Sequence, residues 1–253
     1  GMYVPFVKLD VRNTPALNKV FEQYSIDAVI HTAAFKSIEE SRLKPLEYYN
    51  DNLSCIMSLM RSMQRTGVRN LVHLSSLAVY GQSSLGLNEN TPFNFNNSNP
   101  YIKSQQMIEE IIRDTVKTDN EWNVAILRVG NVVGAFEQAV LGEFVQPLPK
   151  NIVPLALQVA TMQRDYIELQ QTAQTEDQTV ERSFVHVLDV CDAIFASLYW
   201  FNHQQNVCES FDIGGYSLSI QQILTEIKQV TGQQIKTIEA TYSFDELDQI
   251  GSN

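Results

Sequence analysis

Two hydroxyl-bearing side chains, Ser76 and Tyr101, are placed where they could act on one substrate. Ser76 follows an apolar run, residues 71–74, that is typical of a buried strand. Tyr101 lies on the first turn of a predicted helix whose isoleucines recur at near-helical spacing. A serine at a strand end and a phenol on the next helix could exchange a proton with a hydroxyl group of a bound sugar. That chemistry requires a neighbouring group that lowers the phenol pKa from about 10.

The elements that must position these hydroxyls alternate along the first half of the chain. We expect helices that begin near Thr14, span Pro45–Thr66 and begin at Tyr101, and we expect strands at Val4–Leu9, Asp27–His31, Arg69–Leu74 and Trp122–Arg128. The strands are apolar without a strict period of two, which predicts a parallel α/β sheet covered on both faces. The small residues Thr32–Ala34 follow one strand and would suit a ligand crevice at the strand ends.

The second half of the chain has a different pattern. Residues 136–157 are less regular and contain several prolines. The polar residues 170–181 are predicted to form an exposed loop. A strand end leading into a helix is predicted over Val185–Phe201, a short strand at Ser210–Ile213, and an amphipathic helix over Ser219–Val230. The chain therefore divides into a regular α/β part and a smaller second part.

Composition limits the classes of function. A length of 253 residues suits one large domain or two small ones, and the net charge of −11 argues against a nucleic-acid surface. The three cysteines are widely spaced, which indicates free thiols in a reducing cytoplasm. No apolar run is long enough to span a membrane, so we expect no membrane partner. No His, Cys, Asp or Glu spacing indicates a metal site.

Several motifs occur in one order along the chain. They are Asp10–Asn13, Val29–Lys36, Lys44–Asn52, Ser75–Gly81, Asn131, Asn151 with Pro154, and Arg182–Asp189. On these motifs the chain resembles the extended short-chain dehydrogenase/reductase (NAD-dependent epimerase/dehydratase) family, in particular its branch of UDP-glucose 4-epimerases.

The resemblance implies a specific fold. It is a reduced Rossmann-like, doubly wound parallel sheet that lacks its first strand–helix–strand unit, with a smaller substrate lobe. Residues 2–134 would be the remnant of the dinucleotide-binding domain and 135–253 the substrate lobe, with 182–215 crossing back to the sheet. The missing strands would leave one edge of Ala28–His31 unpaired. We expect either Val4–Leu9 to close against that edge or a neighbouring subunit to cover it.

The resemblance also implies roles for individual residues. The family reaction is NAD-dependent epimerisation of a UDP-hexose at C4, with Ser76 and Tyr101 as the catalytic hydroxyls. The vestigial cofactor contacts would be Asp10, Val11, Ala33, Lys36 and Asn52, and the contacts to a UDP-sugar would be Asn131, Asn151 and Arg182. A homodimer would form through the helices Pro45–Thr66 and Tyr101–Lys117, and the protein would be cytoplasmic.

Three departures from the family pattern weaken that expectation. The sequence has no glycine-rich loop for a pyrophosphate ahead of its first helices, because no glycine lies between Met2 and Thr66. Gln105 stands where the family has the catalytic lysine, and Lys103 would lie about 200° round the helix from Tyr101. The tail after Ile235 lacks the family's Arg-Glu-Gly-Asp segment. We therefore expect weak or absent NAD binding and an impaired or inactive epimerase. The alternative is a non-catalytic nucleotide-sugar-binding or structural remnant.

Overall fold

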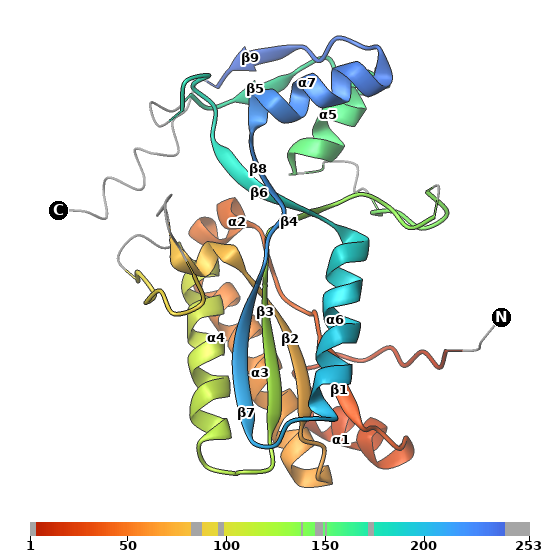
Figure 1. The fold of residues 1–253 in the computed structure, drawn as a ribbon, viewed down its shortest axis with the longest axis vertical. Helices are drawn as coiled ribbons and strands as arrows, with labels where there is room; N and C mark the ends of the chain where they lie inside the picture. The colour runs from red at the N-terminus through yellow and green to blue at the C-terminus, as the bar shows by residue number, and fades with distance from the viewer. Residues whose placement is uncertain are drawn as a thin grey trace. The chain divides into compact units, whose positions relative to one another are not determined.

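The structure is a computed structural model, and it describes residues 4–81, 88–95, 99–137, 139–144, 149, 151–171 and 175–240 (Figure 1). The chain forms two compact units. The first comprises Gly1–Val129 and Asp192–Ile213, and the second comprises Gly130–Cys191 and Gly214–Asn253. Among the described residues, no helix is long and apolar enough to cross a membrane.

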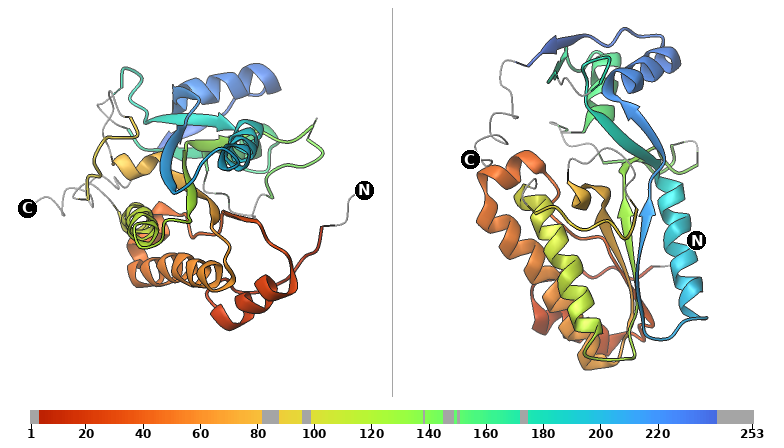
Figure 2. Two further views of the ribbon diagram at one scale, coloured as in Figure 1. Left: turned by 60° about the horizontal axis from the view of Figure 1, so that its bottom comes forward. Right: turned by 60° about the vertical axis from the view of Figure 1, so that its left-hand side comes forward.

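The first unit is built on a parallel sheet of order β1-β2-β3-β7. Its elements are α1 (Thr14–Gln23), β1 (Ala28–His31), α2 (Ile38–Leu43), α3 (Pro45–Thr66), β2 (Asn70–Ser76), the 3₁₀ turn η1 (Leu77–Tyr80), α4 (Pro100–Val116), β3 (Asn123–Val129), the later part of α6 (Val187–Phe201) and β7 (Val207–Ile213). Figure 2 shows α3 and α4 on one side of this sheet and α6 on the other.

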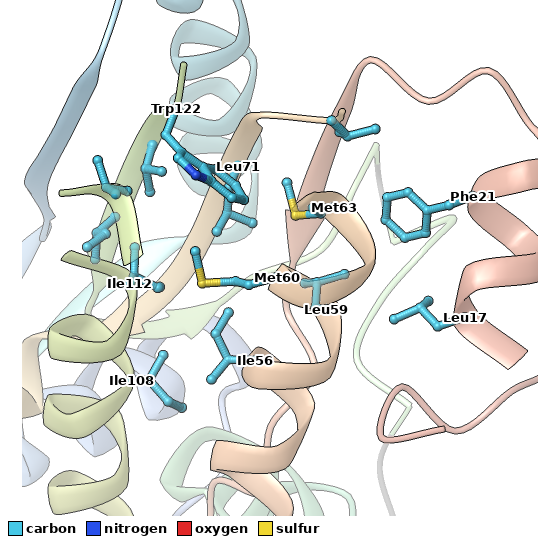
Figure 3. Close-up of a cluster of buried hydrophobic side chains, with 14 residues drawn as sticks. Leu17, Phe21, Ile56, Leu59, Met60, Met63, Leu71, Ile108, Ile112 and Trp122 are labelled. Carbon is cyan, nitrogen blue, oxygen red and sulfur yellow. The ribbon is translucent and has the colours of Figure 1, made fainter. Parts of the chain in front are cut away.

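Successive residues of the central strands supply two separate cores. Leu71, Val124 and Ile126 pack with the apolar sides of α1, α3 and α4, around the fully buried Trp122 (Figure 3). Val72 and Leu127 face the opposite way and pack with Phe201 of α6. Because both faces are buried, the strands read as continuous apolar runs rather than as alternating ones. The α/β fold with a parallel sheet is therefore confirmed.

The second unit contains two small sheets. Its elements are β4 (Asn131–Val133), α5 (Ile152–Ala160), β5 (Ile167–Leu169), β6 (Glu181–His186), β8 (Tyr216–Ser219), α7 (Ile220–Thr231) and β9 (Thr237–Glu239). β6 pairs in parallel with β4 and antiparallel with β8, and β5 pairs with β9. Ala156 of α5 and Leu224 of α7 are buried in the core between these helices. Ser219 caps α7 through a reciprocal capping box with Gln222, which fixes where that helix begins.

The expected strand at Val4–Leu9 is wrong. Residues 4–10 form no strand, and the side chains of Val4 and Phe6 are 76% and 84% exposed. Leu9 packs against the core that α1 and α3 share, so the segment is held there rather than beside β1. Within the described residues, β1 therefore pairs only with β2, and closure of its outer edge by this chain's own N-terminal segment is also wrong. Coverage of that edge by a second subunit remains a prediction.

Candidate active site

Ser76 and Tyr101 come together in the first unit because two caps place them. Asn99 accepts a hydrogen bond from the backbone of Ile102 at 3.0 Å, and Pro100 occupies the first position of α4, so Tyr101 lies in the first turn. Ser76 ends β2 and caps the 3₁₀ turn, accepting from the backbone nitrogen of Ala78 at 3.2 Å. The hydroxyl group of Ser76 lies near that of Tyr101 and lowers the pKa of its phenol.

The surroundings of Tyr101 favour its protonated form. Burial is the main effect and raises the pKa of the phenol above its ordinary value, and the nearby Tyr48 raises it further. The nearby Ser76 hydroxyl opposes this shift without cancelling it. At neutral pH the phenol is therefore a hydrogen-bond donor rather than a base.

Gln105 lies one turn after Tyr101 and carries no charge. Its side chain is 2% exposed, and its Nε2 has no hydrogen-bond partner among the described residues. A buried amide donor without a partner costs about 1–3 kcal/mol. The position thus supplies no cation for Tyr101 and, within the described residues, leaves its amide donor unpaired.

Asn52 forms hydrogen bonds that hold the loop following β1. Its Oδ1 accepts from the backbone nitrogen of Phe35 at 2.8 Å, and its Nδ2 donates to the carbonyl of Phe35 at 3.1 Å and to Ser104 Oγ at 3.0 Å. Asn52 is buried, whereas Ala33 and Lys36 on the loop are exposed. The loop is therefore fixed to α3 and, through Ser104, to α4.

Asp10 and Val11 are occupied by contacts within the chain. The carboxylate of Asp10 accepts from the guanidinium and the backbone nitrogen of Arg12, at distances of 2.6–3.1 Å, and these hydrogen bonds lower its pKa to about 2. Arg12 also pairs with Asp51 of α3. Val11 is half-buried and packs against the core. The Asp10 carboxylate is thus ionised and already neutralised by a neighbouring cation.

A buried network of charges lies beside this site, and the sequence reasoning missed most of it. Ser75 donates to Glu109 at 2.6 Å, and Arg128 donates to both oxygens of Glu109, the shortest distance being 2.7 Å. Arg128 also donates to Tyr80 Oη at 2.7 Å, and that hydroxyl donates to the Asp212 carboxylate at 2.7 Å. We define these five residues as the Arg128 network.

The Arg128 network fixes the turn that follows Ser76. The guanidinium carbon of Arg128 lies 5.0 Å from the ring centre of Tyr80, the last residue of η1, and 5.2 Å from that of Phe93. Burial is the main effect on both the Tyr80 phenol and the Asp212 carboxyl, and it raises the pKa of each. A signal for the network was present in the sequence, since Glu109 stands between Ile108 and Ile112 in an apolar helix pattern.

The three predicted substrate contacts all belong to the second unit. Asn131 lies in β4 opposite Phe184, Asn151 precedes α5 without a side-chain capping bond, and Arg182 lies in β6 opposite Leu218. All three are exposed. Within the described residues none of them has a side-chain hydrogen bond or an ion pair.

The described residues hold no group of three or more His, Cys, Asp or Glu side chains placed to bind a metal ion.

Comparison with known proteins gives matches over most of the chain. Residues 2–214 match the model of the NAD dependent epimerase/dehydratase family. The chain is 37% identical to UDP-glucose 4-epimerase of Homo sapiens over 238 residues, covering 93% of this chain and 68% of that protein. It is 35% identical to UDP-glucose 4-epimerase 2 of Arabidopsis thaliana over 243 residues, covering 95% and 69%.

Solved structures give the same result. The crystal structure of UDP-glucose 4-epimerase from Stenotrophomonas maltophila, with bound NAD and formylated UDP-arabinopyranose, matches with a TM-score of 0.87 and 30% identity. That match covers 94% of this chain and 71% of the other. The enzyme from Bifidobacterium longum in complex with NAD⁺ and UDP also matches with a TM-score of 0.87, at 30% identity over 92% of this chain and 70% of the other.

Proposed function

This chain belongs to the NAD-dependent epimerase/dehydratase family, and from that premise we propose that it is a UDP-hexose-binding relative of UDP-glucose 4-epimerase in which the redox step is impaired. Solved relatives carry NAD together with UDP or a UDP-sugar. In this proposal the chain keeps the recognition of the nucleotide sugar, whereas the residues around Tyr101 are poorly suited to the redox step.

The proposal includes a finer description of the fold. The sheet is a doubly wound one whose first strand–helix–strand unit is not among the residues given, residues 2–134 belong to the dinucleotide-binding part, and residues 135–253 are the substrate lobe. The unpaired outer edge of β1 among the described residues supports this description, since a parallel strand buried on both faces normally has neighbours on both edges.

One observation carries the functional proposal: Tyr101 is half-buried beside a buried, neutral Gln105, and its phenol pKa is raised. A general base works best when its pKa lies near the operating pH. A nearby cation would lower the pKa of the phenol by a unit or more. Burial alone acts in the opposite direction, so Tyr101 can donate a hydrogen bond to a sugar hydroxyl but is a poor acceptor of its proton.

The residues present do not fit the dinucleotide. A pyrophosphate is normally held by backbone N–H groups of a glycine-rich turn at a helix N-terminus. Here α1 begins with Thr14–Pro15 and α3 begins with Pro45, and no glycine lies between Met2 and Thr66. Asp10 is already paired with Arg12, and the side-chain amide of Asn52 is committed to the loop after β1. Ala33 and Lys36 are exposed, as is the already paired Asp10.

Unlike Asp10 and Asn52, the predicted contacts to the nucleotide sugar form no side-chain hydrogen bonds within the described residues. Arg182 offers a guanidinium that suits a diphosphate, because Arg–phosphate hydrogen bonds are charge-assisted and can be bidentate. Asn131 and Asn151 offer carboxamides, which can both donate to and accept from a sugar or a uracil. Their exposure supports binding of a UDP-sugar that does not depend on NAD.

Calorimetric titration with UDP, UDP-galactose and NAD, together with an assay for conversion of UDP-galactose, tests the proposal. We expect UDP and UDP-galactose to bind, Arg182→Gln to weaken both, NAD to show no saturable binding, and no conversion to occur. Saturable NAD binding with turnover would refute the impairment. Absence of UDP binding would favour the alternative, a purely structural remnant.

The variant Gln105→Lys separates the two defects of the predicted cofactor site. The introduced cation should lower the pKa of Tyr101 by a unit or more, which an ultraviolet pH titration against Tyr101→Phe measures. We expect this variant still to lack epimerase activity, because the residues that would hold a pyrophosphate are not restored. Measurable turnover by Gln105→Lys would show that the charge at position 105 was the only defect.

A further inference from the structure

Two buried histidines face each other across the outer pair of strands in the first unit. His31 ends β1 and lies directly opposite His73 in β2. Their Nδ1 atoms are 3.1 Å apart, and the rings are stacked with centroids 5.2 Å apart and planes 20° from parallel. The two residues are 5% and 1% exposed. We call this contact the histidine pair.

The histidine pair requires at least one neutral imidazole, and burial favours the neutral form of both rings. A hydrogen bond between two Nδ1 atoms requires that one ring donates its proton and the other accepts. The accepting ring then carries its proton on Nε2, and neither Nε2 has a partner among the described residues. One added proton buries an unpaired cation, and a second makes both Nδ1 atoms donors and breaks the contact.

The neighbouring elements offer no group that would stabilise a charged imidazole. On β3 the residue opposite His73 is Ile126, and the buried charges Arg128 of β3 and Glu109 of α4 pair with each other. On α3, Asp51 pairs with Arg12, and Cys55 is a thiol. Burial lowers the pKa of His31 to about 4, and burial together with the charge of His31 lowers that of His73.

The histidine pair lies where β1 ends and the loop 32–36 begins. β1 is four residues long, and within the described residues it is bonded to β2 alone. The exposed loop 32–36 follows His31 directly, and beyond the strand it is held through Asn52. A change in the histidine pair therefore acts on the most weakly held strand of the sheet and on the loop at its carboxyl end.

We propose that the histidine pair is an acid-sensitive contact whose protonation releases the end of β1 and the loop 32–36 from β2. In the closed state the two imidazoles are neutral, and in the open state they reach water and titrate as ordinary histidines, with a pKa near 6.5. The open state therefore binds more protons between about pH 6.5 and pH 4, and closure weakens as the pH falls through that window. Above about pH 6.5 the contact contributes fully.

Hydrogen exchange measured by mass spectrometry on the full chain at pH 7.5 and pH 5.0 tests the proposal, after correction for the intrinsic pH dependence of exchange. In the native chain the protection of residues 28–36 should fall on the order of thirtyfold, as a closed-state pKa of about 4 and an open-state value near 6.5 require for His31 alone. Peptides from β3 should change far less.

A matched pair of variants identifies the cause. The double variant His31→Phe/His73→Phe fills both strand positions without a titrating group and should reduce the change in residues 28–36 to less than twofold. His203→Gln removes an exposed histidine of the same unit and should leave the native response intact. An undiminished response in the double variant would overturn the proposal.

A measurement on the native chain keeps the proposal testable if the double variant does not fold. The chain has four histidines, His31, His73, His186 and His203. Their ring-proton NMR titration should show two with pKa values well below 6.5, assigned to His31 and His73 through the single variants of His186 and His203. Four ordinary titrations would overturn the proposal.

Discussion

Ser75 and Ser76 are adjacent in β2, yet their hydroxyl groups belong to two different kinds of polar site. Ser75 donates to Glu109, whose charge Arg128 neutralises, and Arg128 in turn contacts Tyr80. Ser76 interacts with Tyr101, beside the neutral Gln105. Tyr101, Gln105 and Glu109 follow one another at intervals of four residues along α4, so they share one side of that helix.

The two sites differ in whether hydrogen-bond and ion-pair partners stabilise a buried charge. A buried ion costs several kcal/mol unless it is paired and hydrogen-bonded, and in the Arg128 network the carboxylate and the guanidinium have several partners each. The Ser76–Tyr101 site holds no ion and leaves the Gln105 amide without a partner. The first arrangement therefore stabilises a buried charge pair, whereas the second holds no charge.

The variant Glu109→Gln should have the largest effect, because it leaves the buried Arg128 without its counter-charge. We expect a loss of about 3–5 kcal/mol in the free energy of unfolding. Urea unfolding followed by tryptophan fluorescence measures it, since both tryptophans, Trp122 and Trp200, belong to the first unit. Glu110→Gln, on the exposed side of the same helix, is the control and should change stability by less than about 0.5 kcal/mol. A loss below about 1 kcal/mol for Glu109→Gln would remove the distinction between the two sites.

The variant Asn52→Ala should have a smaller but clear effect. It removes the hydrogen bonds to both backbone groups of Phe35 and to Ser104, so we expect a loss of about 2 kcal/mol and faster proteolysis within residues 32–37. Asn50→Ala, an exposed change in the same helix, should be nearly neutral. Equal proteolysis rates for the two variants would show that Asn52 does not hold the loop.

The variant Gln105→Met should have the opposite sign. Methionine keeps the shape of the side chain and removes the unpaired amide, so we expect stability to be unchanged or to rise by up to about 1 kcal/mol. The same urea unfolding measures the change. A loss of more than about 1 kcal/mol would mean that the Gln105 amide has a partner in solution, and the contrast with Glu109 would then be weaker.

The variant Arg65→Ala should have the smallest effect. Arg65 of α3 pairs with Glu22 of α1 at 2.9 Å, but both side chains are more than half exposed. Exposed ion pairs contribute about 0–1 kcal/mol, and added salt screens them. We expect a loss below about 0.5 kcal/mol at low salt that disappears in 1 M NaCl. A loss comparable with that of Glu109→Gln would show that burial does not determine how much an ion pair contributes to stability.

The long regular elements could be predicted from the sequence because their signals are local. The helix Pro45–Thr66 was predicted with its observed bounds, which Pro45 sets at the first position and Gly67 sets at the end by adopting a φ of +77°. The helix carrying Tyr101 was predicted one residue late, since Asn99 and Pro100 start it. Helix α2 and the short strands β4, β5, β8 and β9 were not predicted, because three to six residues give too little periodicity.

The sequence by itself determined the alternating α/β order, the family, and the pairing of a serine and a tyrosine on neighbouring elements, because each depends on residue types at short, fixed spacing. Only the tertiary structure decided that Val4–Leu9 forms no strand, since a strand requires a neighbour to bond. It also decided that Arg128 neutralises Glu109 and that His31 meets His73, because burial and distance between residues far apart in the chain set which ionisable groups are charged.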